Sequence, residues 1–267
     1  MAEQAAPEAR AGQTRAPDQQ QAEQSELQAE QRRVAVVTGG SRGVGRAVVE
    51  ALAEHGWRVF FASRNPDSVT QAAAELAARF GEKVSGRPID VRRQEEVDGL
   101  FGWVEDEAGR IDCLVNNAGL GTFGPVDALS GDQWREVLET NLYGAFYCIR
   151  AAAPIMKRQG DGWIFNIGSL AGKNAFAGGA AYNASKFGLI GLSEAAMLDL
   201  RGHGVRVAAI LPGSIDSGFR SPRDGAAGHD WMLLPADVAA MVLHLLSYPP
   251  RVLPSLIEMR PTRPPSR

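Results

Sequence analysis

The sequence is poor in cysteine, in long apolar runs and in excess positive charge, and each shortage excludes a class of protein. Only two cysteines, Cys113 and Cys148, occur in 267 residues. No motif pairs them, so we expect reduced core thiols rather than a disulfide framework. No apolar run approaches the roughly 20 residues that a membrane-spanning helix needs. The N-terminus also lacks the basic start and apolar centre of a secretory signal. These absences favour a cytoplasmic protein.

The charges and histidines exclude two further kinds of site. Lys and Arg number 28 against 31 Asp and Glu, a net charge of −3, which lacks the basic footprint of a nucleic-acid binder. The four histidines (His55, His203, His229 and His244) have no metal-ligand spacing, so no metal site is expected.

Composition divides the chain into three parts. Residues 1–32 contain no aromatic residue and one large aliphatic residue, Leu27, too little apolar surface to offset the entropy of ordering. We therefore expect a disordered N-terminal tail, although an arm or scaffold that binds a partner remains an alternative. Residues 33–260 are expected to form a single folded domain, followed by a Pro-rich tail at 261–267.

Within the expected domain, apolar runs of strand length alternate with longer stretches of helical periodicity. Strands are expected at residues 34–38, 58–62, 84–89, 112–116, 162–168, 205–211 and 256–260. Helices are expected at residues 43–55, 67–80, 94–108, 132–157, 181–201 and 235–247. This alternation predicts an α/β fold: a doubly wound parallel sheet of the Rossmann type, about seven strands flanked by helices on both faces. Ligands of such sheets bind beyond the carboxyl ends of the strands.

A glycine-rich turn follows the first expected strand and reads Thr38-Gly39-Gly40-Ser41-Arg42-Gly43-Val44-Gly45. Glycines at three of these positions let backbone turn sharply, approach a pyrophosphate and pack a helix against a strand. The N–H groups at the start of the next helix favour an anion. The pattern therefore predicts a dinucleotide site formed by Gly39, Ser41, Arg42, Gly43, Val44 and Gly45. A flexible loop without a ligand is the alternative.

The end of the second strand indicates which dinucleotide is bound. A site for NAD commonly has an acid there, which binds the ribose 2′-hydroxyl. This chain has Ser63 and Arg64 instead, and a guanidinium can grip a 2′-phosphate that a carboxylate would repel. Arg42 could reach the same phosphate from the other side. We therefore predict NADP(H) as the cofactor, with solvated surface arginines as the alternative.

The third strand is followed by Asp90 and Val91, where the adenine ring of a dinucleotide should lie. Asp90 could accept a hydrogen bond from the exocyclic amine, and the Val91 backbone could complete the contact. An ordinary helix N-cap is the alternative for Asp90, because Asp is favoured at that position.

Tyr182 and Lys186 lie four residues apart in the helix expected at 181–201, which places them on one face. An isolated phenol titrates near pH 10, roughly three units too high for acid–base work at neutral pH. An ammonium about 4 Å away, at an effective dielectric of about 20, supplies about the 4 kcal/mol that three units represent. Ser169 ends the fifth strand, where its hydroxyl could donate to a substrate oxygen that gains negative charge.

Together these motifs resemble the short-chain dehydrogenase/reductase family over about residues 33–260. The resemblance rests on their order along the chain: the turn at 38–45, Asn116-Asn117-Ala118-Gly119, Ser169, Tyr182-Asn183-Ala184-Ser185-Lys186 and Pro212-Gly213. It implies that residues 33–260 form a single dinucleotide-binding catalytic domain, which moves a hydride between NADP(H) and a carbonyl or secondary alcohol. It also implies a homodimer or homotetramer assembled through the helices expected at 132–157 and 181–201.

The resemblance also assigns roles to individual residues. It implies that Ser169 orients the carbonyl, that Tyr182 transfers the proton and contacts the cofactor, and that Lys186 lowers the tyrosine pKa and binds the nicotinamide ribose. Asn141 matches the family asparagine that positions a water for proton relay. Further cofactor contacts are expected from Asn117, Ala118, Gly119, Pro212, Gly213, Ile215 and Ser217. Ser217 stands where the family often has Thr, and it keeps the hydroxyl.

The substrate is indicated only by class. Three loops should line its pocket, and they contribute mostly apolar side chains: Leu120, Thr122, Phe123, Leu170, Phe176, Phe219, Trp231 and Met232. The chain ends without the glycine-rich segment of many relatives, which favours a small apolar or 3-hydroxy-acid-like substrate. A 3-oxoacyl-acyl-carrier-protein reductase is the alternative. A non-catalytic dinucleotide-sensing protein is the rival from another class, although it would not need Ser169, Tyr182 and Lys186 together.

Overall fold

The structure is a computed structural model that describes residues 33–219 and 231–263. The tail expected at 1–32 and the last four residues of the tail expected at 261–267 therefore lie outside the described residues.

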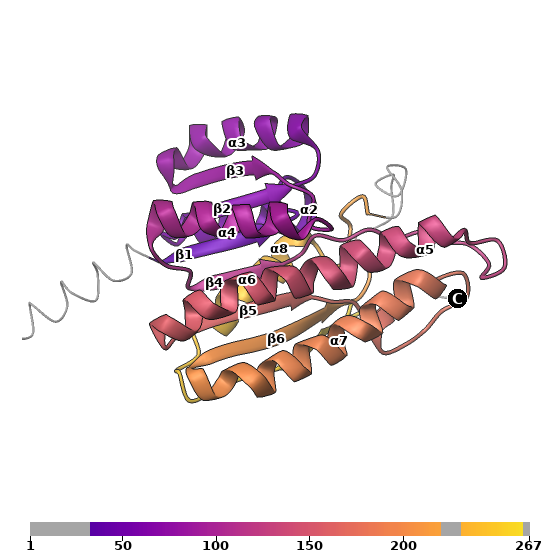
Figure 1. The fold of residues 1–267 in the computed structure, drawn as a ribbon. Coiled ribbons are helices and arrows are strands. Elements are labelled where there is room, and N and C mark those ends of the chain that lie inside the picture. Colours follow the sequence, from indigo (N-terminus) through magenta and orange to yellow (C-terminus); the bar gives the residue numbers. More distant parts are fainter. Residues whose placement is uncertain (1–32, 220–230, 264–267) are drawn as a thin grey trace, which may run out of the picture.

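Seven strands form one parallel sheet, as the sequence predicts (Figure 1). They are β1 (Val34–Thr38), β2 (Arg58–Ser63), β3 (Val84–Pro88), β4 (Cys113–Asn116), β5 (Gly162–Ile167), β6 (Val205–Pro212) and β7 (Leu256–Met259). Their order is β3-β2-β1-β4-β5-β6-β7, and every neighbouring pair is parallel. The chain reverses its direction of travel across the sheet between β1 and β4, and such switch points are where ligands bind.

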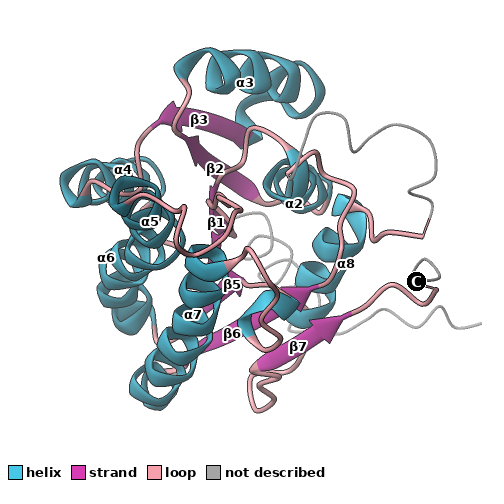
Figure 2. Ribbon diagram, turned by 90° about the vertical axis from the view of Figure 1, so that its right-hand side faces the viewer, coloured by secondary structure: helices cyan, strands magenta, loops and turns pink. Residues whose placement is uncertain are grey.

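Helices cover both faces of the sheet (Figure 2). On one face, α2 (Gly43–Glu54), α3 (Pro66–Phe80) and α8 (Pro235–Leu246) bury apolar side chains against the strands. On the other face, α4 (Gln94–Ala108), α6 (Gly144–Gln159) and α7 (Ala180–Leu200) do the same. Strands that are buried on both sides appear in the sequence as continuous apolar runs, which is why the inner strands could be predicted. None of the helices in these described ranges is long and apolar enough to cross a bilayer.

Each core contains one of the two cysteines. Cys113 lies in β4 within the core beneath α2, α3 and α8, and Cys148 lies in α6 within the opposite core. Both are free and buried, which confirms their prediction as core thiols. Burial raises the pKa of Cys148 to about 12 and raises that of Cys113 as well.

The prediction of a single helix at 132–157 is wrong in one respect. The segment consists of α5 (Gly131–Leu138), a π-helical turn η2 (Glu139–Tyr143) and α6. The widened turn faces inward with Asn141, whose buried amide bonds to the Leu120 backbone and to Ser185. The partners that hold this turn lie 21 and 44 residues away in the sequence, so the local sequence pattern did not reveal the π-turn. The other helices and strands match their expected bounds or differ from them by one residue at one or both ends.

Candidate active site

A cleft of about 1080 Å³ opens at the carboxyl ends of the strands. It brings together nearly all the predicted site residues. Its walls include Gly39, Ser41, Arg42, Gly43, Val44, Ser63, Arg64, Asp90, Val91, Asn117, Ala118, Gly119, Ser169, Tyr182, Lys186, Pro212, Gly213, Ile215 and Ser217. Gly45 and Asn141 do not line this cleft; both pack behind its walls.

The turn between β1 and α2 has the shape that a bound anion requires. Gly39 and Gly43 adopt φ of +68° and +56°, a region that favours glycine. Helix α2 begins at Gly43, and Arg42 precedes it in extended conformation without a side-chain cap. The first backbone N–H groups of a helix have no intrahelical partner. These groups therefore lie at the wall of the cleft, where an anionic ligand could accept from them.

Gly45 provides a test of how tightly this turn packs. A Cβ added there would lie 2.2 Å from the Gly39 carbonyl oxygen, which belongs to backbone. Gly45→Ala should therefore lower the free energy of unfolding by about 3 kcal/mol, the upper end of overpacking costs, as measured by urea denaturation. Gly99→Ala is the matched control, because Gly99 lies in α4 with open space around it. The control should stabilise the protein by up to about 1 kcal/mol, and equal effects of both variants would refute the packing argument.

Thr38 and Asn117 clamp the ends of β1 and β4 together. The Thr38 hydroxyl accepts hydrogen bonds from the backbone N–H groups of Asn117 (3.1 Å) and Ala118 (3.0 Å). The Asn117 amide in turn donates to the carbonyls of Thr38 (3.1 Å) and Gly39 (3.2 Å). Sequence reasoning missed Thr38 as part of the site and gave Asn117 only a cofactor contact. The Asn117 side chain holds the glycine turn in place.

The residues after β2 lie where the sequence places them, but one has an unexpected partner. The Ser63 hydroxyl accepts from the Ser41 backbone at 3.2 Å, which ties the glycine turn to β2. Arg64 lines the cleft and forms an ion pair of 2.9 Å with Glu136 of α5. Nothing in the sequence indicated that a carboxylate faces the predicted phosphate-binding arginine.

Asp90 lines the same end of the cleft, and its N-cap alternative is wrong. The residue before α4 is Arg93, which makes no side-chain cap. The Asp90 carboxylate instead accepts a hydrogen bond from the backbone N–H of Arg92 at 3.1 Å. It also accepts hydrogen bonds of 2.5 to 2.9 Å from the Arg92 guanidinium. Burial works to raise the pKa of Asp90, but the bonds from Arg92 outweigh it and hold that pKa below its ordinary value.

Tyr182 and Lys186 of α7 line the opposite end of the cleft. Lys186 is buried, and its Nζ donates to the Ile167 carbonyl at 2.9 Å. The Nζ lies 5.7 Å from the centre of the Tyr182 ring. Burial lowers the pKa of Lys186 to about 8. The spacing of four residues thus places a cation of reduced pKa beside the phenol, within one cavity.

Ser169 and Asn141 occupy different places relative to the cleft. Ser169 follows β5 in extended conformation, lines the cleft, and accepts from the Ala171 backbone at 3.1 Å. Asn141 accepts from the Leu120 N–H at 2.8 Å and donates to the Leu120 carbonyl (2.8 Å) and the Ser185 hydroxyl (2.9 Å). Its amide therefore ties a loop of the cleft wall to α7. The water-positioning role stays a prediction.

Aromatic rings surround the Tyr182 phenol. The ring of Phe123 lies 5.6 Å from it and that of Phe219 lies 5.8 Å away, centre to centre, while Phe176 packs on Phe123 at 6.0 Å. Of the residues expected around the substrate, the cleft is lined by Leu120, Phe123, Leu170, Phe176, Phe219, Trp231 and Met232. Thr122 does not line it, and the middle of the expected third loop, residues 220–230, lies outside the described residues.

The cleft also contains residues that sequence reasoning missed. Thr140 and Arg260 both line it. Arg260 follows β7, so the rule that parallel strands deliver their functional side chains at the carboxyl end could have found it. Thr140 precedes Asn141 in the π-turn and had no signal of its own. Within the described ranges, no group of three or more His, Cys, Asp or Glu side chains could hold a metal ion.

Comparisons with known proteins point to one family. The family model described as short chain dehydrogenase matches residues 33–226. An uncharacterized oxidoreductase of Staphylococcus aureus is 32% identical over 232 residues, which cover 86% of this chain and 97% of that protein. The uncharacterized oxidoreductase YxjF of Bacillus subtilis is 34% identical over 186 residues, covering 70% and 72%.

Solved structures show the same fold. A metagenomic short-chain oxidoreductase in complex with NADP is 36% identical, with a TM-score of 0.75 and coverage of 87% of this chain and 98% of that one. An alcohol dehydrogenase of the archaeon Thermococcus sibiricus, complexed with 5-hydroxy-NADP, is 29% identical with a TM-score of 0.81, covering 88% and 99%. The chain belongs to the short-chain dehydrogenase/reductase family.

Proposed function

We propose that the protein is an NADP(H)-dependent oxidoreductase that transfers a hydride between the nicotinamide ring and a carbonyl or secondary alcohol, with Tyr182 as general acid and base. One observation carries this proposal. Tyr182, Ser169 and the buried Lys186 line the same cleft as the glycine turn between β1 and α2. A site for a dinucleotide and a site for proton transfer are therefore continuous, which a protein that only senses a dinucleotide would not need.

Each side chain has a distinct part in the reaction. NADPH, when bound, supplies the hydride. Tyr182 donates the phenolic proton to the substrate oxygen, and Ser169 donates a hydrogen bond to the same oxygen as negative charge grows there. Lys186, held by the Ile167 carbonyl, favours the phenolate that remains. In the reverse direction the phenolate takes the proton from the alcohol.

Three features support NADP(H) over NAD(H). No acid follows β2, and Arg64 lines the cleft at that point. Arg42 lines it from the glycine turn, so two guanidinium groups border the place where a 2′-phosphate would lie. Two of the similar solved structures contain NADP or 5-hydroxy-NADP.

Reversing the charge at residue 64 tests the cofactor assignment. Arg64→Asp should weaken NADPH binding by about tenfold or more, because a charge-assisted contact is lost and a repulsive one gained. It should change NADH binding much less. Fluorescence titration of both cofactors measures the two constants. Arg79→Asp, on exposed α3 away from the cleft, controls for the net charge, and equal losses of NADPH and NADH would contradict the assignment.

The substrate proposed is a small apolar or 3-hydroxy-acid-like molecule. The rings of Phe123, Phe176 and Phe219 give the catalytic end an apolar wall. Arg260 adds a cationic group to the same cleft. A screen of NADPH oxidation over ketones, aldehydes and 3-oxo acids tests the proposal directly. Turnover of small carbonyls supports it, whereas NADPH binding without turnover of any class would favour a sensor.

Two further assignments complete the proposal. Residues 33–260 form the catalytic unit, of which 33–226 match the family model. The protein assembles as a homodimer or homotetramer through the α5–α6 segment and α7. Large apolar side chains on those elements are exposed in the single chain, among them Trp134, Tyr143, Phe146 and Phe187.

A further inference from the structure

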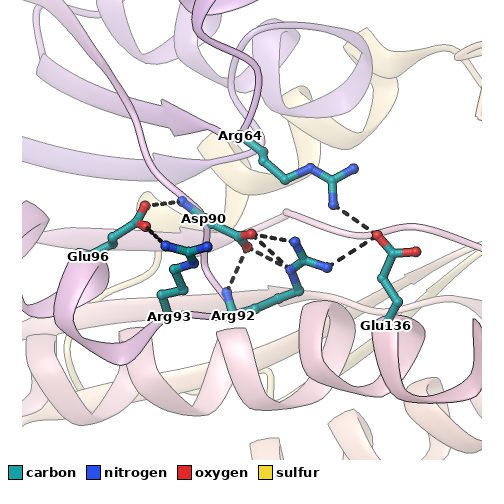
Figure 3. Close-up of polar contacts among 6 residues, drawn as sticks. All are labelled: Arg64, Asp90, Arg92, Arg93, Glu96 and Glu136. Carbon is teal, nitrogen blue, oxygen red and sulfur yellow. Dashed lines mark hydrogen bonds and ion pairs between the residues drawn. The ribbon is translucent and has the colours of Figure 1, made fainter. Parts of the chain in front are cut away.

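Glu136 of α5 faces two arginines that come from different parts of the chain (Figure 3). Its Oε1 lies 2.9 Å from a guanidinium nitrogen of Arg64, which follows β2, and 3.3 Å from one of Arg92, which precedes α4. One carboxylate oxygen therefore bridges two cations at the end of the cleft predicted to receive a 2′-phosphate.

The two arginines differ in how firmly they are held. Arg92 makes three guanidinium contacts to the Asp90 carboxylate, at 2.9, 2.9 and 2.5 Å. It is mostly buried, with 27% of its side chain exposed, whereas 57% of the Arg64 side chain is exposed. Among the described residues, Glu136 is the one acid within ion-pair distance of Arg64, and the Asp90 carboxylate interacts with Arg64 only through a longer-range charge attraction. Arg64 is thus the arginine that can change partner, and Arg92 is fixed.

We infer that Glu136 is an internal competitor of the cofactor's 2′-phosphate for Arg64, and that it thereby sets how strongly the enzyme prefers NADP(H). This inference rests on the proposed function. A monoester phosphate carries about −1.5 to −2 charges at neutral pH, against −1 for a carboxylate, and offers oxygens to both nitrogens of the guanidinium fork. The phosphate therefore displaces Glu136, while the 2′-hydroxyl of NAD(H) does not.

The exchange is feasible because neither partner is left isolated. The Arg64–Glu136 pair is exposed on both sides, at 57% and 39%, and exposed ion pairs are weak. When Arg64 turns to a phosphate, Glu136 keeps the guanidinium of Arg92 as a partner. A buried carboxylate without a second arginine would instead resist release. The arrangement lowers affinity for a 2′-phosphate modestly.

Glu136→Gln tests this inference through binding rather than activity. Calorimetry on the full chain should show adenosine 2′-monophosphate and NADP⁺ binding about twofold to fivefold more tightly, the range that removal of one exposed ion pair represents. Binding of NAD⁺ should not change. Asp132→Asn is the matched control, because it removes one acid from the same helix, where Asp132 pairs with Arg135. The control should leave all three constants unchanged.

A double variant separates competition from simple charge. In an Arg64→Ala background, Glu136→Gln should no longer affect NADP⁺ binding, since the competition acts through Arg64. An effect that persists, a weaker affinity for NADP⁺, or equal changes for NAD⁺ and NADP⁺ would overturn the inference. The proposed function fails separately: it falls if the wild-type protein itself shows no preference for the 2′-phosphate. If the wild type prefers NADP⁺ over NAD⁺ but Glu136→Gln does not change that preference, only the competitor role of Glu136 is refuted.

Discussion

Tyr182→Phe should lower kcat by about 10² to 10⁴-fold, the contribution of a positioned general acid or base. The substitution keeps the ring, so its packing against Phe123 and Phe219 survives, while the hydroxyl and its transferable proton are lost. Steady-state kinetics with the best carbonyl substrate measure the effect. The dissociation constant of NADPH, from fluorescence titration, should stay within about twofold, because no charge changes.

Tyr248→Phe is the matched control for this experiment. Tyr248 packs against His244 beyond the end of α8, away from the cleft, and loses the same hydroxyl. Its turnover should equal that of the wild type. Comparable turnover by Tyr182→Phe would remove the phenol from the mechanism, whereas loss of NADPH binding in this variant would mean that the hydroxyl holds the cofactor instead.

Lys186→Met should abolish most of the activity and also remove a distinct pH dependence of stability. The folded-state pKa of Lys186 is about 8, against an ordinary value of 10.5, and burial is the cause. Between these pH values the unfolded chain binds more protons than the folded one. The free energy of unfolding of the wild type should therefore rise by about 3 kcal/mol from pH 8 to 10.5 through this group.

The difference between the variant and the wild type isolates that contribution. Other groups titrate in both proteins and cancel when urea unfolding is compared at each pH. Met at residue 186 also leaves the Ile167 carbonyl without its donor, which costs about 1–3 kcal/mol at every pH, so only the slope is diagnostic. If the free energy of unfolding changes with pH equally in the two proteins, the pKa of Lys186 is not lowered in the folded state. Lys83→Met is the control, because Lys83 is exposed in the short 3₁₀ turn η1 (Gly81–Lys83).

The parallel sheet was predictable because its inner strands are buried on both faces. Runs such as residues 34–37 and 207–211 are apolar throughout, and their alternation with helical segments predicts parallel pairing. Most of the site followed from the same rule, since its motifs fall at the ends of strands, except for Tyr182 and Lys186, which were found from their spacing within α7. Gly39, Gly43 and Tyr182 could therefore be assigned to the cleft without knowing which distant residues contact them.

What the sequence did not reveal depends on contacts between distant residues. Glu136 lies 72 positions from Arg64 and looks like any acid on an amphipathic helix. The π-turn is invisible for a related reason: Asn141 bonds to Leu120, 21 residues away, and to Ser185, 44 away. Local patterns report burial and periodicity, so they place the elements but not the polar pairs formed when elements meet.

The positions of the two thiols have a practical consequence. Cys113 and Cys148 sit on opposite sides of the sheet, each sealed in its own core. Since burial raises the pKa of both, almost no thiolate exists at neutral pH, and thiolate is the form that alkylating reagents attack. An alkylating reagent can therefore reach either sulfur only after the helices that cover it have moved away from the sheet. The relative alkylation rates of the two cysteines therefore report which layer of helices opens first.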